Sequence, residues 1–231
     1  MALPCDDLWV FAYGSLMWQP GFRFEEAYHA RLDGYHRAFC VYSVHYRGAP
    51  EHPGLVLGLD RGGVCEGMVY RVAGCEAVSV RAYLTARELI YGVYRATRVP
   101  VTIVGGSRLR VLALTFVAER RHPSYAGRLG LVEQVRRIRS ARGRAGSNMA
   151  YLVNTLRHLK ELGIRERQIE RIAALAGRHR EQAEPSGKRA PVRRAAHKSG
   201  LAAGPGAWRF RPEQRARFGH RARLERRTWS T

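Results

Sequence analysis

The chain has 231 residues, 45% of them hydrophobic, which is enough for one domain with a full core and an appendage but argues against two complete domains. Its formal net charge of +21 would ordinarily indicate a polyanionic partner such as nucleic acid. The first residues lack a signal-peptide pattern and no run of about eighteen apolar residues occurs, so we expect a cytoplasmic protein without a membrane span.

The N-terminal stretch WVFAYGSLMW, residues 9–18, predicts a buried strand that stops at a tight turn. Gly14 can adopt a positive φ and has no Cβ to block a ligand. The consecutive N–H groups of residues 13–16 are therefore expected to converge on an anion such as a carboxylate. An ordinary strand-to-loop turn that begins the domain is the alternative.

The middle of the sequence predicts further strands. Residues 36–44 form the second expected strand, and residues 45–54 form a loop because two prolines and two glycines cannot sustain a helix or a ladder. Residues 55–59 and 64–72 predict a hairpin around the turn sequence DRGG at 60–63. Two more strands are expected over residues 99–104 and 109–117.

A first helix is predicted over residues 75–91, with Gly92 closing it. The residues expected on its buried face are Val78, Ala82 and Leu84 or Thr85.

Three more helices are predicted toward the C-terminus, over residues 129–139, 147–162 and 165–176. Ser147 is the expected N-cap of the second of these, because its hydroxyl can accept a hydrogen bond from an N–H of the first turn. Gly163 is expected to end the same helix.

The positive charge is concentrated after these helices. From Arg178 onward, fifteen basic residues stand against four acids in a stretch without a hydrophobic stripe. Such a sequence cannot bury enough apolar surface to offset the entropy of ordering, so we expect a folded domain over residues 1–177 and a disordered basic tail over 178–231. Aromatic residues among the arginines would suit stacking on single-stranded nucleic acid. A solvated extension without a partner is the favoured interpretation.

The four cysteines are spread along the chain without a C-x-x-C pair or clustered histidines, so the sequence indicates neither a zinc site nor a disulfide framework. They are Cys5, Cys40, Cys65 and Cys75. Cys40 and Cys65 lie in apolar, strand-like runs, where reduced cysteines usually serve as packing residues.

Glu88 is the candidate for acid–base chemistry, because it stands just ahead of an apolar cluster at the end of the first predicted helix. Burial there would penalise the ionised form and raise the pKa, as a general base working near neutral pH requires. From these residues alone, a surface ion pair with neighbouring Arg87, worth under about 1 kcal/mol, is the alternative.

Five segments, taken together and in order, resemble the ChaC-type γ-glutamylcyclotransferases over roughly residues 8–177. They are WVFAYGSLMW, YRGAPEHPGLVLGLD, CEGMVYRV, RAYLTARELIYGVY and GRAGSNMAYLVNTLRHLKELGI. The resemblance implies an α+β fold with a small barrel-like sheet and flanking helices. It also implies cleavage of glutathione, a small-molecule substrate, to 5-oxoproline and cysteinylglycine, without a metal or an organic cofactor.

The resemblance also assigns roles to particular positions. The catalytic Glu of the family's R-E motif matches Glu88. The family's substrate loop, with its flanking residues, matches Ala12, Tyr13, Gly14, Ser15, Leu16 and Met17.

Two further motifs match only in part. Arg47 and Gly48 match an H-R-G loop, although Tyr46 precedes the arginine here. In the late motif, Ala150 replaces the acidic residue that the family has before Tyr-Leu, whereas Asn148 and Tyr151 are retained. That replacement leaves the role of the late motif open.

The chemistry of a γ-glutamyl amide fits this set of residues. The substrate's α-amino nitrogen can reach its own γ-carbonyl through a five-membered ring, so the enzyme need supply neither nucleophile nor water. The hypothesis is that amides of residues 13–16 hold the α-carboxylate while Glu88 takes the ammonium proton and delivers it to the departing amine. Ser15 lacks a G-x-S-x-G elbow and is expected to donate a hydrogen bond. The aromatic residues that could line the pocket, or belong to the core, are Tyr13, Tyr91 and Tyr151.

Two other functions remain open from the sequence. One is cyclotransferase activity on other γ-glutamyl amides. The other is a nucleic-acid-binding protein that uses the basic tail, for which the sequence pI of about 11.0 is the motive.

Overall fold

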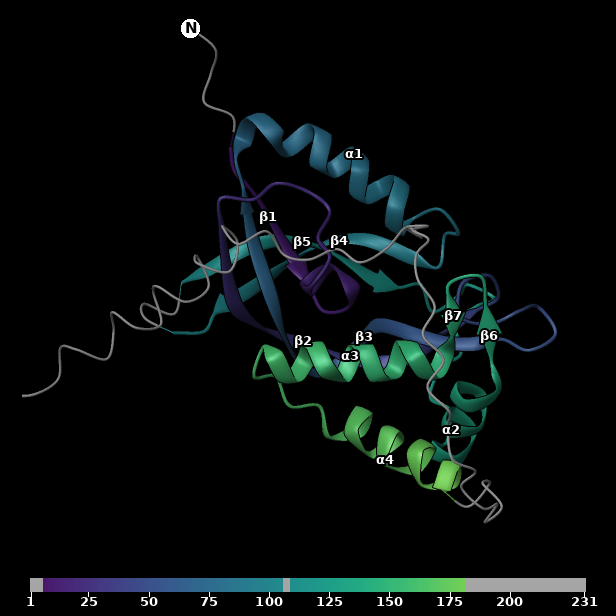
Figure 1. The fold of residues 1–231 in the computed structure, drawn as a ribbon. Helices are drawn as coiled ribbons and strands as arrows, with labels where there is room; N and C mark the ends of the chain where they lie inside the picture. The colour runs from purple at the N-terminus through teal and green to yellow at the C-terminus, as the bar shows by residue number, and fades with distance from the viewer. Residues whose placement is uncertain (1–5, 106–108, 182–231) are drawn as a thin grey trace, which may run out of the picture. The chain divides into compact units, whose positions relative to one another are not determined.

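The computed structural model describes residues 6–105 and 109–181 of the chain (Figure 1). Its strands are β1 (Leu8–Ala12), β2 (Glu26–Ser43), β3 (Gly54–Val72), β4 (Tyr94–Ile103), β5 (Arg110–Ala118), β6 (Arg142–Gly143) and β7 (Gly146–Ser147). Its helices are α1 (Ala77–Glu88), α2 (Leu131–Ser140), α3 (Asn148–Glu161) and α4 (Arg167–Glu181), and two short 3₁₀ turns cover Ser15–Met17 and Gly74–Glu76. The α+β class expected from the sequence is confirmed.

The five long strands close into a barrel in the order β1-β3-β2-β4-β5. Strand β1 completes it by pairing antiparallel with β3 on one side and parallel with β5 on the other. Closure leaves no free edge along these strands, which removes the row of unpaired backbone groups that an open sheet would present. The small barrel-like sheet is therefore also confirmed.

Strand β2 is much longer than predicted, because it begins at Glu26 rather than at residue 36. Its first half mixes polar side chains with apolar ones, which obscured the strand pattern. The two apolar side chains Ala30 and Leu32 are nevertheless buried, with exposed neighbours at alternate positions. A strand with one face on the core and one in solvent gives this alternation.

The hairpin predicted at residues 60–63 is wrong. Strand β3 runs unbroken from Gly54 to Val72 and pairs with β2 along nearly its whole length. Gly62 and Gly63 have φ values of +97° and +74°, and the register shifts beside them around Gly34. The glycines thus form a β-bulge, which uses the same left-handed backbone conformation as a tight turn.

Helix α1 lies over one side of the barrel, whereas α2, α3 and α4 pack against one another on another side (Figure 1). The face predicted for α1 is right at Leu84, which is fully buried, but wrong at Val78, which is 81% exposed, and at Ala82, which is also exposed. The helix buries Ala77 and Val80 together with Leu84. The predicted N-cap of α3 is confirmed, because the Ser147 hydroxyl accepts a hydrogen bond from the Ala150 N–H at 3.1 Å.

The two ends of the chain fall partly outside the described residues. Helix α4 continues to Glu181, four residues beyond the predicted domain end at 177, and the rest of the predicted tail, 182–231, is not described. Cys5 is not described either, while Cys40 and Cys65 are buried free thiols, as expected, and Cys75 is exposed. None of the helices in the described ranges is long and apolar enough to cross a membrane.

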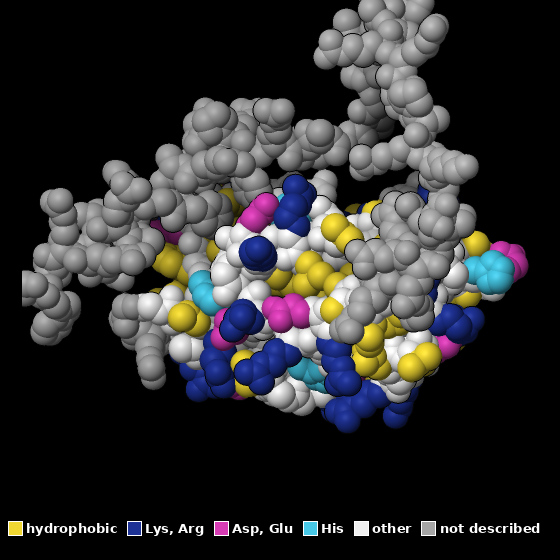
Figure 2. Space-filling model, turned by 60° about the horizontal axis from the view of Figure 1, so that its bottom comes forward, with side chains coloured by type: hydrophobic (Ala, Val, Ile, Leu, Met, Phe, Trp, Pro, Cys, Tyr) yellow, Lys and Arg dark blue, Asp and Glu magenta, His cyan; other side chains and the backbone are white. Residues whose placement is uncertain are grey.

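Basic side chains are spread over the face shown in Figure 2, with acidic ones between several of them. Many arginines of the described chain are paired with acids. Arg71 contacts both Asp7 and Glu26, and Arg136 and Arg137 share Glu133. Mixed charge of this kind keeps a surface hydrated and does not by itself indicate a polyanion-binding groove.

Candidate active site

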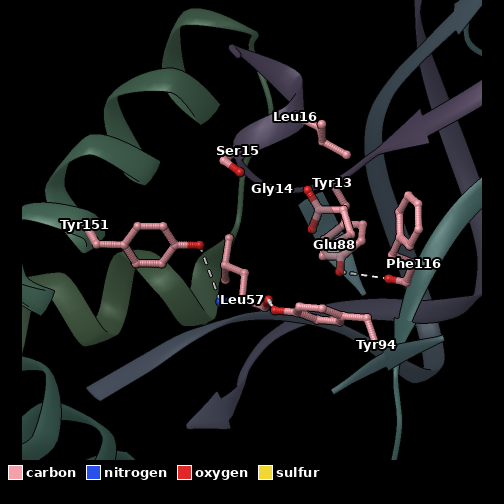
Figure 3. A pocket seen from close by; sticks show the side chains of 9 residues that line it. All are labelled: Tyr13, Gly14, Ser15, Leu16, Leu57, Glu88, Tyr94, Phe116 and Tyr151. Carbon is pink, nitrogen blue, oxygen red and sulfur yellow. Dashed lines mark hydrogen bonds between the residues drawn. The ribbon is translucent and has the colours of Figure 1, made fainter. Parts of the chain in front are cut away.

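A small cavity of about 60 Å³ lies where one end of the barrel meets α1 and α3 (Figure 3). It is lined by Tyr13, Gly14, Ser15, Leu16, Leu57, Glu88, Tyr94, Phe116 and Tyr151. These residues come from six parts of the chain, most of which are far apart in the sequence. The fold therefore brings together the loop after β1 and the acidic residue at the end of α1, the two features that the sequence singled out.

Glu88 is the last residue of α1, and its carboxyl points into the cavity (Figure 3). Its side chain is only 19% exposed. Burial raises the pKa of Glu88 above the ordinary value, and the adjacent Arg87 guanidinium opposes that rise. The sequence left a surface ion pair as the alternative; the pair exists, with 3.1 Å between Arg87 Nε and Glu88 Oε1, but it is largely shielded from solvent.

Arg87 connects the acidic residue to the loop on the other side of the cavity. Its Nη2 donates to the Ser15 hydroxyl at 3.2 Å, and its Nη1 donates to the Gln19 carbonyl at 2.8 Å and to the Tyr83 hydroxyl at 2.9 Å. One side chain thus fixes the distance between Glu88 and the loop. Sequence reasoning read Arg87 only as a neighbour of Glu88, because the contact with Ser15 arises from the fold.

The loop after β1 differs from the expected turn in one respect. Gly14 has φ −127°, so it does not use the positive φ that glycine permits. A Cβ at this glycine would meet no atom within 4 Å, which shows that the space beside it is open. Ser15 then begins a 3₁₀ turn, with Met17 N–H bonded to the Gly14 carbonyl at 2.9 Å. The first N–H groups of such a turn have no acceptor within it, so they are suited to a bound anion.

Two of the expected loop residues lie behind the cavity rather than on it. Ala12 is the last residue of β1 and is fully buried, and Met17 is buried with its sulfur 3.7 Å from Arg37 Nη2. Neither lines the cavity. Ser15 does line it, but its hydroxyl is bonded to Arg87, and no histidine is among the lining residues of the described ranges, so a serine nucleophile has no support there.

Three phenols surround the cavity, and they use their protons differently. Tyr13 donates to the Phe116 carbonyl at 2.8 Å and Tyr94 donates to the Leu57 carbonyl at 2.7 Å. Tyr151 instead accepts a hydrogen bond from the Leu57 N–H at 3.4 Å (Figure 3). Tyr151 is the acceptor in that bond, so its own O–H can be donated to the nearby Thr155 hydroxyl or to a ligand oxygen.

These phenols remain protonated around neutral pH. Burial raises the pKa of Tyr151 to about 12, and burial together with nearby acidic groups raises the pKa values of the other two further. Tyr94 was missed in the sequence, which pointed instead to Tyr91. Tyr91 lies outside the cavity, 41% exposed, and stacks on His45 with 5.0 Å between ring centroids.

A buried arginine, Arg37, holds the loop after β1 in position. The Arg37 side chain is 0% exposed and forms an ion pair with Glu166, which stands just before α4. Its Nε donates to the Tyr13 carbonyl and its Nη2 to the Glu66 carbonyl, both at 2.5 Å. The backbone at Tyr13 is thereby fixed to the barrel and to the C-terminal helices. Sequence reasoning missed Arg37, because its partner is 129 residues away.

Within residues 6–105 and 109–181, no group of three or more His, Cys, Asp or Glu side chains is arranged to hold a metal ion. The described groups that line the cavity are a shielded carboxylate, backbone amides and phenols.

Comparison with known proteins gives a consistent result. The model of the ChaC-like protein family matches residues 8–179. The chain is 33% identical over 159 residues to the glutathione-specific gamma-glutamylcyclotransferase of Escherichia coli (strain K12), covering 69% of this chain and 68% of that protein. It is 32% identical over 185 residues to the protein of the same name from Schizosaccharomyces pombe, covering 72% and 89%.

Among solved structures, a gamma glutamyl cyclotransferase specific to glutathione from yeast aligns with a TM-score of 0.68. The alignment covers 78% of this chain and 99% of that chain at 20% sequence identity. At this level of identity the match shows a shared fold.

Proposed function

Because this chain belongs to the ChaC-like protein family, we propose that it is a γ-glutamylcyclotransferase that cleaves glutathione to 5-oxoproline and cysteinylglycine. The names of both relatives reported above support glutathione as the substrate. The observation that carries the proposal is a carboxyl group shielded from solvent, Glu88, in one cavity with the loop at Gly14.

In the proposed reaction, the substrate's α-amino nitrogen attacks its own γ-carbonyl carbon. A C–N bond forms to close the five-membered ring, and the C–N bond to the cysteine residue breaks. Glu88 takes one proton from the α-ammonium group before the attack and passes it to the departing nitrogen. The ring nitrogen loses a second proton once the new bond has formed, and this proton follows the same route, so cysteinylglycine leaves with an ammonium group. Neither water nor an external nucleophile enters the balance. Holding the reacting atoms together within one molecule contributes several kcal/mol of the acceleration.

The raised pKa of Glu88 suits both halves of this proton transfer. A carboxylate with the ordinary pKa of about 4.3 would be a weak base toward an ammonium group at neutral pH. Burial strengthens Glu88 as a base, and the Arg87 guanidinium opposes part of that rise in the pKa.

The other lining groups have complementary roles in the proposal. The amides of residues 13–16 hold the α-carboxylate, which places the α-amine beside Glu88. The Tyr151 hydroxyl donates its free proton to the γ-carbonyl oxygen, where negative charge develops as the ring closes. Ser15 receives a hydrogen bond from Arg87 and so helps to position the loop rather than to attack the substrate.

The test replaces Glu88 with glutamine, which keeps the shape of the side chain and removes the base. We expect kcat for 5-oxoproline release from glutathione to fall by about 10²- to 10⁴-fold, the usual contribution of a positioned acid–base group. Glu161→Gln is the matched control, because Glu161 is 58% exposed at the end of α3. Full turnover by Glu88→Gln, with an unchanged melting temperature, would remove Glu88 from this role.

Substrate choice and location complete the proposal. Comparing kcat/KM for glutathione and for γ-glutamyl dipeptides distinguishes a glutathione-specific enzyme from one that acts on other γ-glutamyl amides. We also propose a cytoplasmic location, which the free thiols of Cys40, Cys65 and Cys75 support and which cell fractionation tests.

A further inference from the structure

Arg47, in the loop between β2 and β3, is a cation held in place beside the cavity. Its backbone N–H donates to the Ser43 hydroxyl at 3.0 Å. In the side chain, Nη1 donates to the carbonyls of Ala145 at 2.5 Å and Ser147 at 3.4 Å. A Cβ on the next residue, Gly48, would come within 2.1 Å of the Gly54 nitrogen, so the loop backbone is packed too closely for a larger residue. The Arg47 guanidinium is therefore fixed in position before any ligand binds.

No ion pair formed among the described residues involves Arg47, which sets it apart from the other arginines near the loop. Arg37 is committed to Glu166, and Arg87 is committed to Glu88. Arg47 is half-buried, and the loss of water around it lowers its pKa, in contrast to an arginine paired with an acid. A partly desolvated cation with carbonyl partners only has unused capacity to bind an anion.

The position of Arg47 relative to the cavity is set by Tyr151. The guanidinium carbon lies 5.4 Å from the centroid of the Tyr151 ring, and Tyr151 lines the cavity together with Glu88 and Gly14. In Figure 3, the Tyr151 side chain reaches from α3 toward the cavity, on a different side from the barrel strands. Arg47 is thus one aromatic ring away from the reacting centre.

Glutathione carries two carboxylates at opposite ends, and an extended tripeptide spans about 10 Å. If the α-carboxylate and the α-amine lie at the Gly14 loop and Glu88, the glycine carboxylate must lie on the leaving-group side, well outside a cavity of about 60 Å³. We propose that Arg47 binds this C-terminal carboxylate of the leaving cysteinylglycine. The inference rests on the proposed function and deepens it, because it names a residue that distinguishes glutathione from γ-glutamyl amides without that carboxylate.

The planar guanidinium suits this role because it can give a carboxylate two parallel hydrogen bonds. The contact is remote from the bonds that form and break, so it acts on binding more than on proton transfer. Loss of Arg47 should accordingly raise KM more than it lowers kcat.

The test combines a substitution of one side chain with a change of one functional group in the substrate. Wild type and Arg47→Met are assayed for 5-oxoproline release from glutathione and from glutathione whose glycine carboxylate is a carboxamide. We expect wild type to prefer glutathione by about ten- to a hundredfold in kcat/KM, as for a hydrogen-bonded charged group. Arg47→Met should lose about that factor on glutathione and almost none on the carboxamide.

Arg144→Met is the matched control, because the Arg144 guanidinium also lies over a tyrosine ring, that of Tyr46 at 5.3 Å, but is exposed. It should keep the wild-type preference. If Arg47→Met does not fold, two experiments replace it. One assays Arg47→Lys on the same two substrates. The other compares competitive inhibition of wild type by cysteinylglycine with inhibition by the carboxamide of cysteinylglycine. We expect Arg47→Lys to retain part of the preference, and wild type to be inhibited more strongly by the free acid.

Equal losses on both substrates, or equal inhibition by both dipeptides, would overturn the assignment of Arg47 and leave the proposed function intact. Release of 5-oxoproline by wild type from neither substrate would instead count against the proposed function.

Discussion

Replacing Arg37 with methionine should destabilise the fold and loosen the loop at Tyr13 together. The substitution keeps a long apolar stem but removes the guanidinium that contacts Glu166 and the carbonyls of Tyr13 and Glu66. Since the Arg37 side chain is fully buried and that of Glu166 only 20% exposed, water cannot readily replace the lost partner. The carboxylate and two backbone acceptors would be left without their donor.

The size of the effect follows from this burial. Removing one partner of a buried, hydrogen-bonded ion pair costs about 3–5 kcal/mol, because it leaves the other charge uncompensated. The two carbonyls belong to the same network, so their contributions do not simply add. In a domain of roughly 150–250 residues, each kcal/mol shifts Tm by about 2–4 °C, which gives an expected decrease of about 6–20 °C.

Thermal and urea denaturation measure this change, and Arg31→Met is the control. Arg31 lies on the same strand and pairs with Asp33, but its side chain is 48% exposed, so we expect a change of less than about 1 kcal/mol. Glu166→Gln, which keeps an oxygen acceptor for Arg37, should fall between the two. If Arg37→Met were as stable as Arg31→Met, the buried pair could not be what fixes the loop.

Two further predictions concern the proposed base and the tail. Arg87→Met removes the cation that opposes the rise in the pKa of Glu88, so the acid limb of the pH profile of kcat/KM should move to higher pH. Because Arg87 also holds the loop through Ser15, activity above the limb should level off below that of wild type. A limb that stays or moves to lower pH contradicts the assignment. A chain truncated after Glu181 retains every residue that lines the cavity in the described part of the chain, so we expect it to keep wild-type turnover of glutathione. Any salt-sensitive binding to nucleic acid should be lost with residues 182–231. Loss of turnover in a folded truncated chain would show that those residues take part in catalysis.

The features that sequence reasoning found are those with a local signature. The strand before Gly14 and the N-cap at Ser147 each depend on a few adjacent residues, so composition and spacing were sufficient. From its own neighbours, Glu88 could have been either a buried general base or a member of a surface ion pair. Only the ordered motifs of the chain favoured a position in a cavity. Its burial could not be read from its neighbours, because Tyr13, Tyr94 and Tyr151 come from distant elements.

The errors have equally physical causes. Gly62 and Gly63 take the positive φ that a hairpin turn would need, and a β-bulge needs the same conformation, so sequence cannot separate the two without the partner strand. The predicted helix was carried to Tyr91, whereas α1 ends at Glu88 and Gly92 turns the chain with φ +66° into β4. Tyr94, three residues after Tyr91, therefore reaches the cavity in place of Tyr91.

The placement of Glu88 also explains why its local environment looks unfavourable for stability. A helix C-terminus carries partial negative charge, so a carboxylate there is destabilised by the helix dipole as well as by burial. Arg87, in the same last turn, offsets part of that cost and is itself held by the loop at Ser15. Glu88 thus goes against the charge preference of a helix C-terminus and against the usual exposure of a carboxylate, yet Arg87 supports it. A functional requirement for a particular proton affinity would produce this combination. The same contact makes the proton affinity of Glu88 depend on the position of the loop, so displacement of the loop should alter both the proposed binding of substrate and the strength of Glu88 as the proposed base.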